Sequence, residues 1–278
     1  MVASQTLEQP GLMKHVFLTG ASSGIGFATA QGLLACGHEV WGTARDPARL
    51  PEQEHFHPVQ LDLRHGSEID GAFLRALRQA GHFDVVINNA GSGHFGAAEF
   101  LPISEIADQF QILFFAPARL IQLALGAMRP RGTGLIINIT SLAERLPVPF
   151  MAAYNAAKAA LVAFTMSMQV ELARSRIRLV DLQPADICTN FNNAVFKCNH
   201  DEFYSAKIAQ AWEIIERNLK NAPEPNLVAR RVVKLIEQAS PAPRLTVGSA
   251  FQARLAPLIF RFLPQRLRIW GLRKYYRL

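Results

Sequence analysis

The segment HVFLTGASSGIGFATAQGLLACG, residues 15–37, constrains the fold more than any other part of the chain. It predicts a short buried strand, a glycine-rich turn and an amphipathic helix that ends at Gly37. Gly20 permits a tight turn, Gly24 lets the backbone approach a pyrophosphate, and Gly26 allows the helix to pack closely on the strand. The start of such a helix offers unpaired N–H groups and a positive dipole end to phosphates. The segment therefore predicts a dinucleotide site, although its G-x-x-x-G-x-G spacing differs from the common G-x-G-x-x-G.

Strands and helices alternate along the rest of the chain. Short apolar runs bounded by Gly, Asp or Asn are typical of strands buried on both faces of a parallel sheet. We expect one α/β domain of Rossmann type over residues 14–250, a doubly wound parallel sheet with helices on both faces. The predicted strands are 15–19, 39–43, 57–61, 84–88, 134–139, 177–182 and 244–248, and the predicted helices are 24–36, 67–80, 103–128, 151–174, 203–220 and 226–239.

Composition agrees with a single domain. The 278 residues are 50% apolar, which is enough to fill one large core. Cys36, Cys188 and Cys198 form no C-x-x-C pair and are interpreted as reduced thiols of a cytoplasmic protein. Residues 1–13 lack the charged and apolar regions of a signal peptide and are expected to form a loose tail. No uninterrupted apolar run in the sequence is long enough to cross a bilayer.

A serine, a tyrosine and a lysine could together move a proton. Tyr154 and Lys158 lie four residues apart in the helix-forming run AAYNAAKAAL, so they share one face of the helix. The charge of Lys158 is expected to lower the pKa of the Tyr154 phenol from about 10 toward working pH, which suits a general acid/base. Ser141 ends the apolar run LIINITS, where its hydroxyl could donate to a carbonyl or alcohol oxygen. A Tyr and a Lys at this spacing also occur as chance surface neighbours, so the motif is weak alone.

Five motifs occur in an order and at spacings that resemble the short-chain dehydrogenase/reductase family. They are TGASSGIG at 19–26, NNAG at 88–91, Ser141, YNAAK at 154–158 and QPADICT at 183–189. The resemblance covers roughly residues 14–250 and extends to NADP-dependent hydroxysteroid and retinol dehydrogenases. It implies a single-domain oxidoreductase with a nicotinamide cofactor, assembled as a homodimer or homotetramer. It also implies that Tyr154 is the acid/base, that Lys158 binds the nicotinamide ribose, and that Ser141 polarises the substrate oxygen.

The end of the second predicted strand, EVWGTARDP, bears on the choice of cofactor. An NAD-dependent enzyme is expected to offer a carboxylate to the ribose 2′-OH there, whereas this chain has Arg45. A guanidinium suits a 2′-phosphate, so we predict NADP(H), with Ser22 adding a hydroxyl. The alternative is that Arg45 is a solvated loop residue and Asp46 supplies the acid. The predicted cofactor-binding residues, several implied by the resemblance, are Gly20, Ser22, Gly24, Ile25, Gly26, Arg45, Asp62, Leu63, Asn89, Ala90, Gly91, Tyr154, Lys158, Pro184, Ile187 and Thr189.

One position departs from the family pattern. Counted from NNAG, the family's catalytic Asn, which helps to hold a water that relays protons to the Lys, would fall at Leu113. A leucine side chain neither donates nor accepts hydrogen bonds. Either Lys158 and solvent move the proton by another route, with Gln111 or a backbone carbonyl assisting, or turnover is much reduced and the chain binds its cofactor for regulation or scaffolding. Because the serine, the tyrosine and the lysine are all present, we favour an active enzyme.

Apolar residues dominate the segments expected to line the substrate pocket. Ligand pockets are mostly apolar with few polar groups, and these segments offer almost no charge to hold an acid or a phosphate. The alternative is that the same residues belong only to the core. We predict a lipophilic alcohol or ketone as substrate, a substrate loop over about residues 186–222, and no metal. The predicted pocket residues are Phe95, Leu146, Phe150 and Phe191.

Residues 251–278 form a basic and apolar C-terminal extension. No Asp or Glu follows Glu237, and the eight basic residues from Arg244 onward account for the whole net charge of +7. Aromatic and aliphatic residues alternate with these arginines, which is typical of a helix that lies on a membrane surface. The alternative is a flap over the substrate mouth or against another subunit. The extension is too apolar for nucleic-acid binding, and it carries no nucleic-acid motif.

Overall fold

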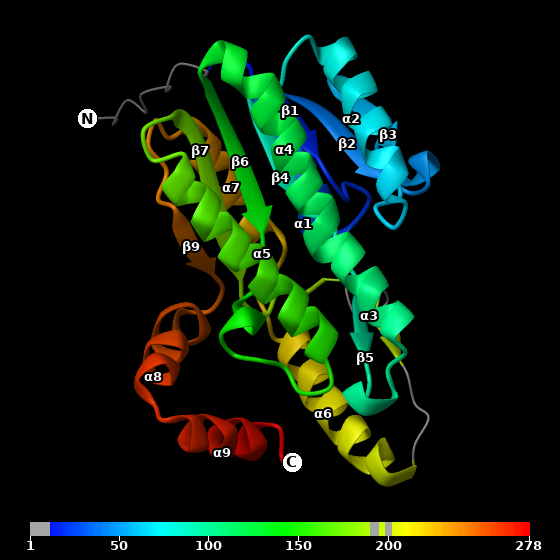
Figure 1. Ribbon diagram of the computed structural model, residues 1–278, viewed down its shortest axis with the longest axis vertical. Helices are drawn as coiled ribbons and strands as arrows, with labels where there is room; N and C mark the ends of the chain where they lie inside the picture. Colours follow the sequence, from blue (N-terminus) through cyan, green and yellow to red (C-terminus); the bar gives the residue numbers. More distant parts are fainter. Residues whose placement is uncertain (1–11, 190–194, 198–201) are drawn as a thin grey trace, which may run out of the picture.

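The computed structural model describes residues 12–189, 195–197 and 202–278. Seven parallel strands form one twisted sheet in the order β3-β2-β1-β4-β6-β7-β9 (Figure 1), which confirms the predicted doubly wound α/β fold. Two short strands, β5 (Gly93–Phe95) and β8 (Val195–Lys197), pair in parallel outside this sheet. The strands of the main sheet are β1 (His15–Leu18), β2 (Glu39–Ala44), β3 (Phe56–Gln60), β4 (Val85–Asn88), β6 (Thr133–Ile139), β7 (Arg176–Pro184) and β9 (Arg244–Val247).

Two layers of helices cover the two faces of the sheet. Successive side chains of a strand point to opposite faces, so Val16 and Leu18 of β1 pack in one core while Phe17 packs in the other. The first core includes residues of α1 and α7, and the second includes residues of α2 and α4. The helices are α1 (Gly24–Ala35), α2 (Gly66–Ala80), α3 (Ile103–Phe110), α4 (Ala116–Met128), α5 (Ala152–Glu171), α6 (Glu202–Lys220), α7 (Asn226–Glu237), α8 (Ala256–Phe262) and α9 (Gln265–Tyr275).

The helix predicted over 103–128 is divided by a π-helical turn, Gln111–Phe115, which joins α3 to α4. Pro117 explains the interruption, because it has no N–H to donate one turn back and its ring crowds the carbonyl of residue 113. The whole run Ile103–Arg131 is long and apolar enough to cross a membrane, contrary to the expectation from the sequence. It packs against α2, α5 and the sheet, as a core helix does, so it is weak evidence for a membrane span.

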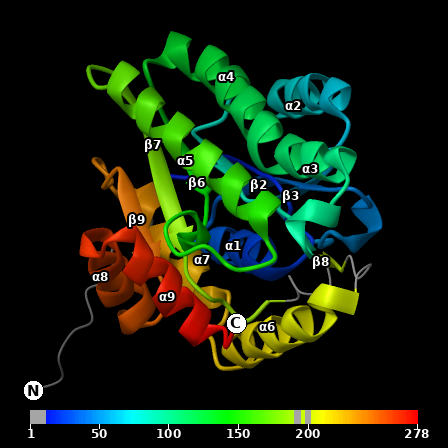
Figure 2. The same cartoon turned by 60° about the horizontal axis from the view of Figure 1, so that its bottom comes forward.

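The strand order changes direction between β1 and β4, and open α/β sheets bind ligands at the carboxyl ends of the strands at such a point. Helices α6, α8 and α9 gather beyond those carboxyl ends (Figure 2). The extension begins with a second π-helical turn, Phe251–Leu255, two residues before Pro257. Pro264 caps α9, whereas Gly271 lies inside α9 and does not end it. The extension therefore lies at the edge of the sheet where a ligand is expected.

Candidate active site

A cavity of about 870 Å³ opens at the carboxyl ends of the strands. It runs from the glycine turn, past Ser141 and Tyr154, to α6 and the extension. Every cofactor-binding residue predicted from the sequence lines this one cavity, from Gly20 in the turn to Thr189 after β7. Motifs far apart in the sequence thus meet at one place.

The glycine turn leaves its backbone open to this cavity. Gly20 and Gly24 have φ angles of +71° and +55°, in the region that favours glycine. A Cβ on Gly26 would lie 2.0 Å from the carbonyl oxygen of Gly20, so helix α1 packs too closely on the turn for any side chain there. A Cβ on Gly24 would come within 3.5 Å of Thr189. These residues fit the close approach of a dinucleotide pyrophosphate to the start of α1.

Asn89 and Thr19 fasten the NNAG turn to the glycine turn. The Thr19 hydroxyl accepts hydrogen bonds from the backbone N–H of Asn89 at 2.9 Å and of Ala90 at 3.1 Å. The Asn89 side chain donates to the carbonyls of Thr19 at 2.9 Å and Gly20 at 3.2 Å. Asn89 therefore holds the shape of the glycine turn as well as lining the cavity.

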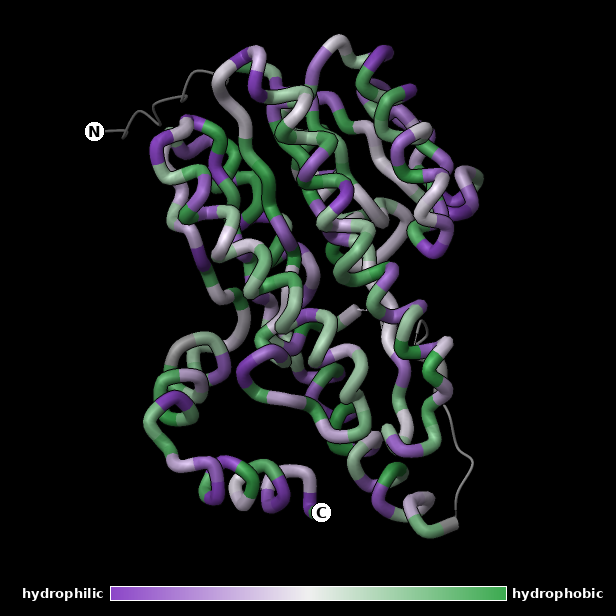
Figure 3. Tube along the Cα trace, viewed as in Figure 1, coloured by the Kyte–Doolittle hydropathy of each residue, from purple (hydrophilic) through white to green (hydrophobic). Residues whose placement is uncertain are grey.

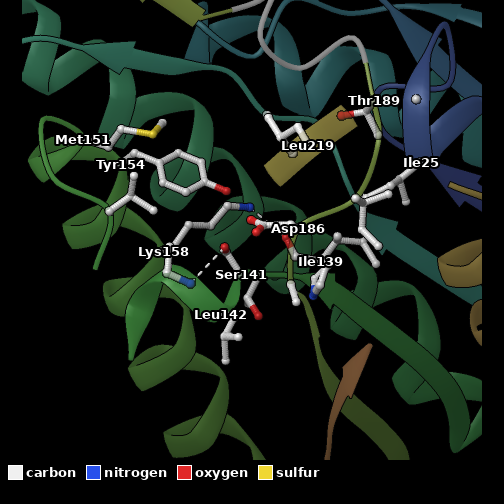
Figure 4. A pocket seen from close by; sticks show the side chains of 18 of the residues that line it. Ile25, Ile139, Ser141, Leu142, Met151, Tyr154, Lys158, Asp186, Thr189 and Leu219 are labelled. Carbon is white, nitrogen blue, oxygen red and sulfur yellow. Dashed lines mark hydrogen bonds between the residues drawn. The ribbon is translucent and has the colours of Figure 1, made fainter. Parts of the chain in front are cut away.

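Ser141, Tyr154 and Lys158 converge on one wall of the cavity (Figure 4). The Ser141 hydroxyl accepts from the backbone N–H of Ala143 at 3.1 Å and is hydrogen bonded to the Tyr154 hydroxyl. Lys158 is buried, and its Nζ donates to the carbonyl of Ile139 at 2.7 Å, 5.9 Å from the centre of the Tyr154 ring. The three predicted groups thus share one small region.

The pKa values in this region are set first by burial. Desolvation lowers the pKa of Lys158 to about 8, and the charge of Asp181 partly opposes this. Desolvation raises the pKa of Tyr154, and its hydrogen bond with Ser141 opposes the increase. We had expected Lys158 to lower the pKa of Tyr154. The structure differs because burial of the phenol dominates, and the ammonium is bonded to a backbone carbonyl.

Two buried polar networks hold the site in place. Asn88 of β4 donates to Asn138 of β6 at 2.8 Å, and Asn138 donates to Thr165 of α5 at 2.8 Å, which ties two strands to the helix that carries Tyr154 and Lys158. In the second network, Asp181 of β7 accepts from Thr140 at 2.5 Å and from Arg244 at 2.7 Å. Desolvation raises the pKa of Asp181, while Thr140 and Arg244 oppose the increase. Sequence reasoning found neither network, because each joins residues distant along the chain.

Positive charge surrounds the end of the cavity next to the glycine turn. Arg45, Arg49 and Arg64 line it, and only the first was predicted. Asp62 is paired with Arg64, whose hydrogen bonds lower the pKa of Asp62. Asp46, the alternative ribose ligand, does not line the cavity, and its carboxylate accepts from the backbone N–H of Ala48 at 3.1 Å. Among the described residues, Arg64 is therefore paired with a carboxylate, whereas no salt bridge joins Arg45 or Arg49 to one.

Leu113 lies in the π-helical turn and is buried. Its neighbour Ile112, not Leu113, lines the cavity, and a Cβ on Gly91 would come 3.4 Å from the Leu113 side chain. Gln111 donates to the carbonyl of Leu63 at 3.0 Å, and among the described hydrogen bonds none joins it to Lys158. Of the two substitutes considered for the missing Asn, the structure thus places a backbone carbonyl, that of Ile139, on Lys158.

Of the predicted pocket residues, Leu146 lines the cavity. Phe95 and Phe150 do not; Phe95 is buried, with its ring 5.9 Å from Phe150 and 4.7 Å from Trp212. Phe191 lies outside the described residues. Met151, the residue just before α5, also lines the cavity. Sequence reasoning missed the apolar residues that α6 and the extension supply; they are Trp212, Ile215, Leu219, Ile259, Phe260, Leu263, Leu267 and Leu272.

Among the described residues, two side-chain hydrogen bonds join the extension to the rest of the site. Gln252 donates to Asp186, which follows β7, at 2.6 Å, and Asn218 of α6 donates to the Tyr275 hydroxyl at 2.8 Å. Desolvation raises the pKa of Asp186, and Gln252 opposes the increase. The alternating polar and apolar residues of the extension were the only sequence signal for this wall.

Comparison with known proteins agrees with this geometry. The chain is 30% identical over 267 residues to 3-ketodihydrosphingosine reductase of Bacteroides thetaiotaomicron, covering 94% of this chain and 97% of that protein. A short-chain dehydrogenase of Streptomyces avermitilis has a similar structure, with a TM-score of 0.79, 27% identity, and coverage of 96% of this chain and 95% of that one. A metagenomic short-chain oxidoreductase in complex with NADP is also similar in structure, with a TM-score of 0.68 and 29% sequence identity. The match covers 84% of this chain and 96% of that one.

A family model described as short chain dehydrogenase matches residues 14–199, more than half of the chain. These residues include the glycine turn, the NNAG turn, Ser141, Tyr154 and Lys158. The protein is thus an oxidoreductase with a nicotinamide site, and it belongs to the short-chain dehydrogenase/reductase family.

Proposed function

We propose that this protein uses NADP(H) to interconvert a lipophilic ketone and the corresponding alcohol, with Tyr154 as the general acid/base. The observation that carries the proposal is the convergence of Ser141, Tyr154 and Lys158 in the cavity that the glycine turn also lines. Catalytic groups and cofactor ligands are useful together only if they surround the same reacting atoms.

Each residue of the site has a defined task in this proposal. The bound nicotinamide supplies or accepts a hydride. Ser141 donates a hydrogen bond to the substrate oxygen, while Tyr154 gives a proton to that oxygen during reduction or removes it during oxidation. Lys158, whose pKa is about 8, carries positive charge at neutral pH; its Nζ is held by the Ile139 carbonyl and would also donate to the nicotinamide ribose.

The choice of NADP(H) rests on charge. The guanidinium groups of Arg45 and Arg49 line the cavity, and a 2′-phosphate suits such groups. The capping role of Asp46 argues against its use as a ribose ligand. The solved metagenomic relative, in complex with NADP, supports the same choice.

The choice of a lipophilic ketone rests on the walls beyond Tyr154. Aliphatic and aromatic side chains from α6 and the extension form most of the surface there. The name of the Bacteroides relative denotes a keto compound of the sphingosine type, which agrees with a lipid-like substrate. Free thiols at Cys36 and Cys188 support a cytoplasmic location.

The proposal is tested with Tyr154→Phe, which keeps the aromatic ring and removes the hydroxyl that would exchange the proton. Turnover of NADPH with a panel of 3-keto sphingoid bases, steroids, retinoids and long-chain ketones should fall about 10²- to 10⁴-fold. The affinity for NADPH, measured by calorimetry, should change less than about twofold. The matched control is Tyr204→Phe on α6, a tyrosine that does not line the cavity.

A second outcome would favour the alternative function. If the wild-type protein binds NADPH but oxidises it no faster than Tyr154→Phe with any member of the panel, the protein binds its cofactor without turnover. The burial of Leu113 at the family's Asn position is the observation behind this alternative.

A further inference from the structure

Helix α9 has two chemically different faces. Residues spaced by three and four positions share one face of a helix. The inner face lines the cavity with Arg268, Gly271, Leu272 and Tyr275. The outer face is exposed and consists of Arg266, Ile269, Trp270 and Arg273. Figure 3 shows the resulting alternation of hydrophobic and hydrophilic residues along this helix.

Helix α8 and the π-helical turn before it repeat the pattern. Ala256, Phe260 and Leu263 face the cavity. Leu255, Leu258 and Phe262, which are also spaced by three and four positions, are 48%, 55% and 76% exposed, and Trp270 of α9 is 61% exposed. Exposed apolar side chains are ordinary singly, but a run of them along consecutive helices marks an interaction surface. From here on, the term outer face covers the exposed residues of α9 named above together with Leu255, Leu258 and Phe262.

The charge of the extension decides what the outer face can bind. Residues 251–278 contain seven basic residues and no acidic one. The Arg261 guanidinium lies 6.0 Å from the Phe262 ring, and the Lys274 ammonium lies 5.3 Å from the Trp270 ring, so cations and apolar groups are neighbours. Two copies that met through the same outer face would bring like charges together. The complementary partner is an anionic surface with an apolar interior, into which the exposed apolar side chains can insert.

We propose that the outer face binds the surface of an anionic lipid bilayer. Leu258, Phe262 and Trp270 would enter the boundary between headgroups and acyl chains, while Arg266 and Arg273 would contact the headgroup phosphates. The inner faces of the same helices line the substrate end of the cavity. If the proposed function is correct, docking would bring this end of the cavity close to a membrane that contains the lipophilic substrate.

The test is co-sedimentation of the full chain with vesicles of phosphatidylcholine containing one quarter phosphatidylglycerol, and with vesicles of phosphatidylcholine alone. Binding is expected only to the anionic vesicles and should weaken as salt is raised. Arg266→Gln with Arg273→Gln should lower the partition coefficient about 30-fold, since each basic residue near such a surface contributes about fivefold. The matched control is Arg174→Gln with Arg230→Gln, two exposed arginines on other parts of the surface.

The apolar contribution is tested by Ile269→Ser with Trp270→Ser, which should lower partition at least about tenfold. Its control is Ile103→Ser with Val170→Ser, two apolar residues that are 79% and 74% exposed elsewhere. Fluorescence locates the contact, because Trp41 is buried and Trp212 lines the cavity. A blue shift on vesicle addition should vanish in Trp270→Phe, while this variant still sediments with the vesicles.

Three results would overturn the proposal: no binding to the anionic vesicles, equal losses in the outer-face and control variants, or a dimer in solution that only the outer-face variants dissociate. The last result would identify a second copy of the chain as the partner. Failure of this proposal can be told apart from failure of the proposed function. Vesicle binding is measured without NADPH, whereas turnover is measured with a dispersed ketone and no vesicles.

Discussion

The two ends of the cavity are built in different ways. The nucleotide end consists largely of backbone in tight turns, the glycine turn and NNAG, each contained in a few consecutive residues. The substrate end consists of side chains from α5, α6 and the extension, and the first and last of these lie more than a hundred residues apart in the sequence. Backbone geometry demands particular residues at fixed spacing, whereas an apolar wall accepts many side chains of suitable volume.

The difference predicts unequal tolerance to substitution, and the largest effect is expected at the glycine turn. Gly26→Ala places a Cβ 2.0 Å from the Gly20 carbonyl, so it should reduce the free energy of unfolding by at least about 3 kcal/mol and abolish NADPH binding. Gly126→Ala, in the interior of α4 with no atom within 4 Å of the new Cβ, should instead stabilise by about 0.5–1 kcal/mol. Thermal melts and NADPH titration of the two variants measure the contrast.

Arg45→Gln tests whether side chains as well as backbone define the nucleotide end. Removal of a charge-assisted contact should lower the preference for NADPH over NADH by about 10- to 100-fold, with little change in the affinity for NADH. The ratio of the two dissociation constants is the measurement, and Arg174→Gln is the control. An unchanged ratio would show that Arg45 is only a solvated loop residue.

Lys158 lies where the two ends meet, and its pKa makes stability depend on pH. The folded protein loses this proton near pH 8, while the unfolded chain keeps it to about 10.5, so the free energy of unfolding rises with pH between these values. In the absence of nucleotide, we compare the free energy of unfolding of the wild type with that of Lys158→Met. From pH 8 to 9.5 this comparison should change in favour of the wild type by about 2 kcal/mol. Urea denaturation measures it, with the exposed Lys234→Met as control. A difference that stays constant with pH would contradict the burial of a charged ammonium.

The smallest effect is expected at the substrate end. Leu272→Ala removes part of an apolar wall that other side chains continue, so KM for a lipophilic ketone should rise about fivefold, or about 1 kcal/mol, with NADPH affinity unchanged. Leu74→Ala, a partly exposed leucine on α2, should leave both constants unchanged. If Leu272→Ala weakened NADPH binding by a larger factor than it raised KM, the two ends of the cavity would not be functionally distinct.

This contrast also explains which parts of the site could be predicted from sequence. The order of strands and helices, the glycine turn and the positions of Tyr154 and Lys158 depend on local patterns, and the structure places them together. Phe95 was predicted at the pocket because it follows NNAG, but its packing against Trp212 turns it into the core. Trp212 itself carries no local signal for the cavity, since its position depends on how α6 folds over the sheet ends. The pKa of Tyr154 was expected to fall because helical spacing shows a neighbouring charge but not the burial that opposes it.

The hydrogen-bonded chain Asn88–Asn138–Thr165 has a consequence for engineering. It fixes α5, the helix that carries Tyr154 and Lys158, to the central strands without using any residue of α6, α8 or α9. Segments 202–220 and 251–278 could therefore be exchanged for those of a relative while the reacting groups keep their alignment. Such chimeras would change the residues that select the ligand while Ser141, Tyr154 and Lys158 stay in place.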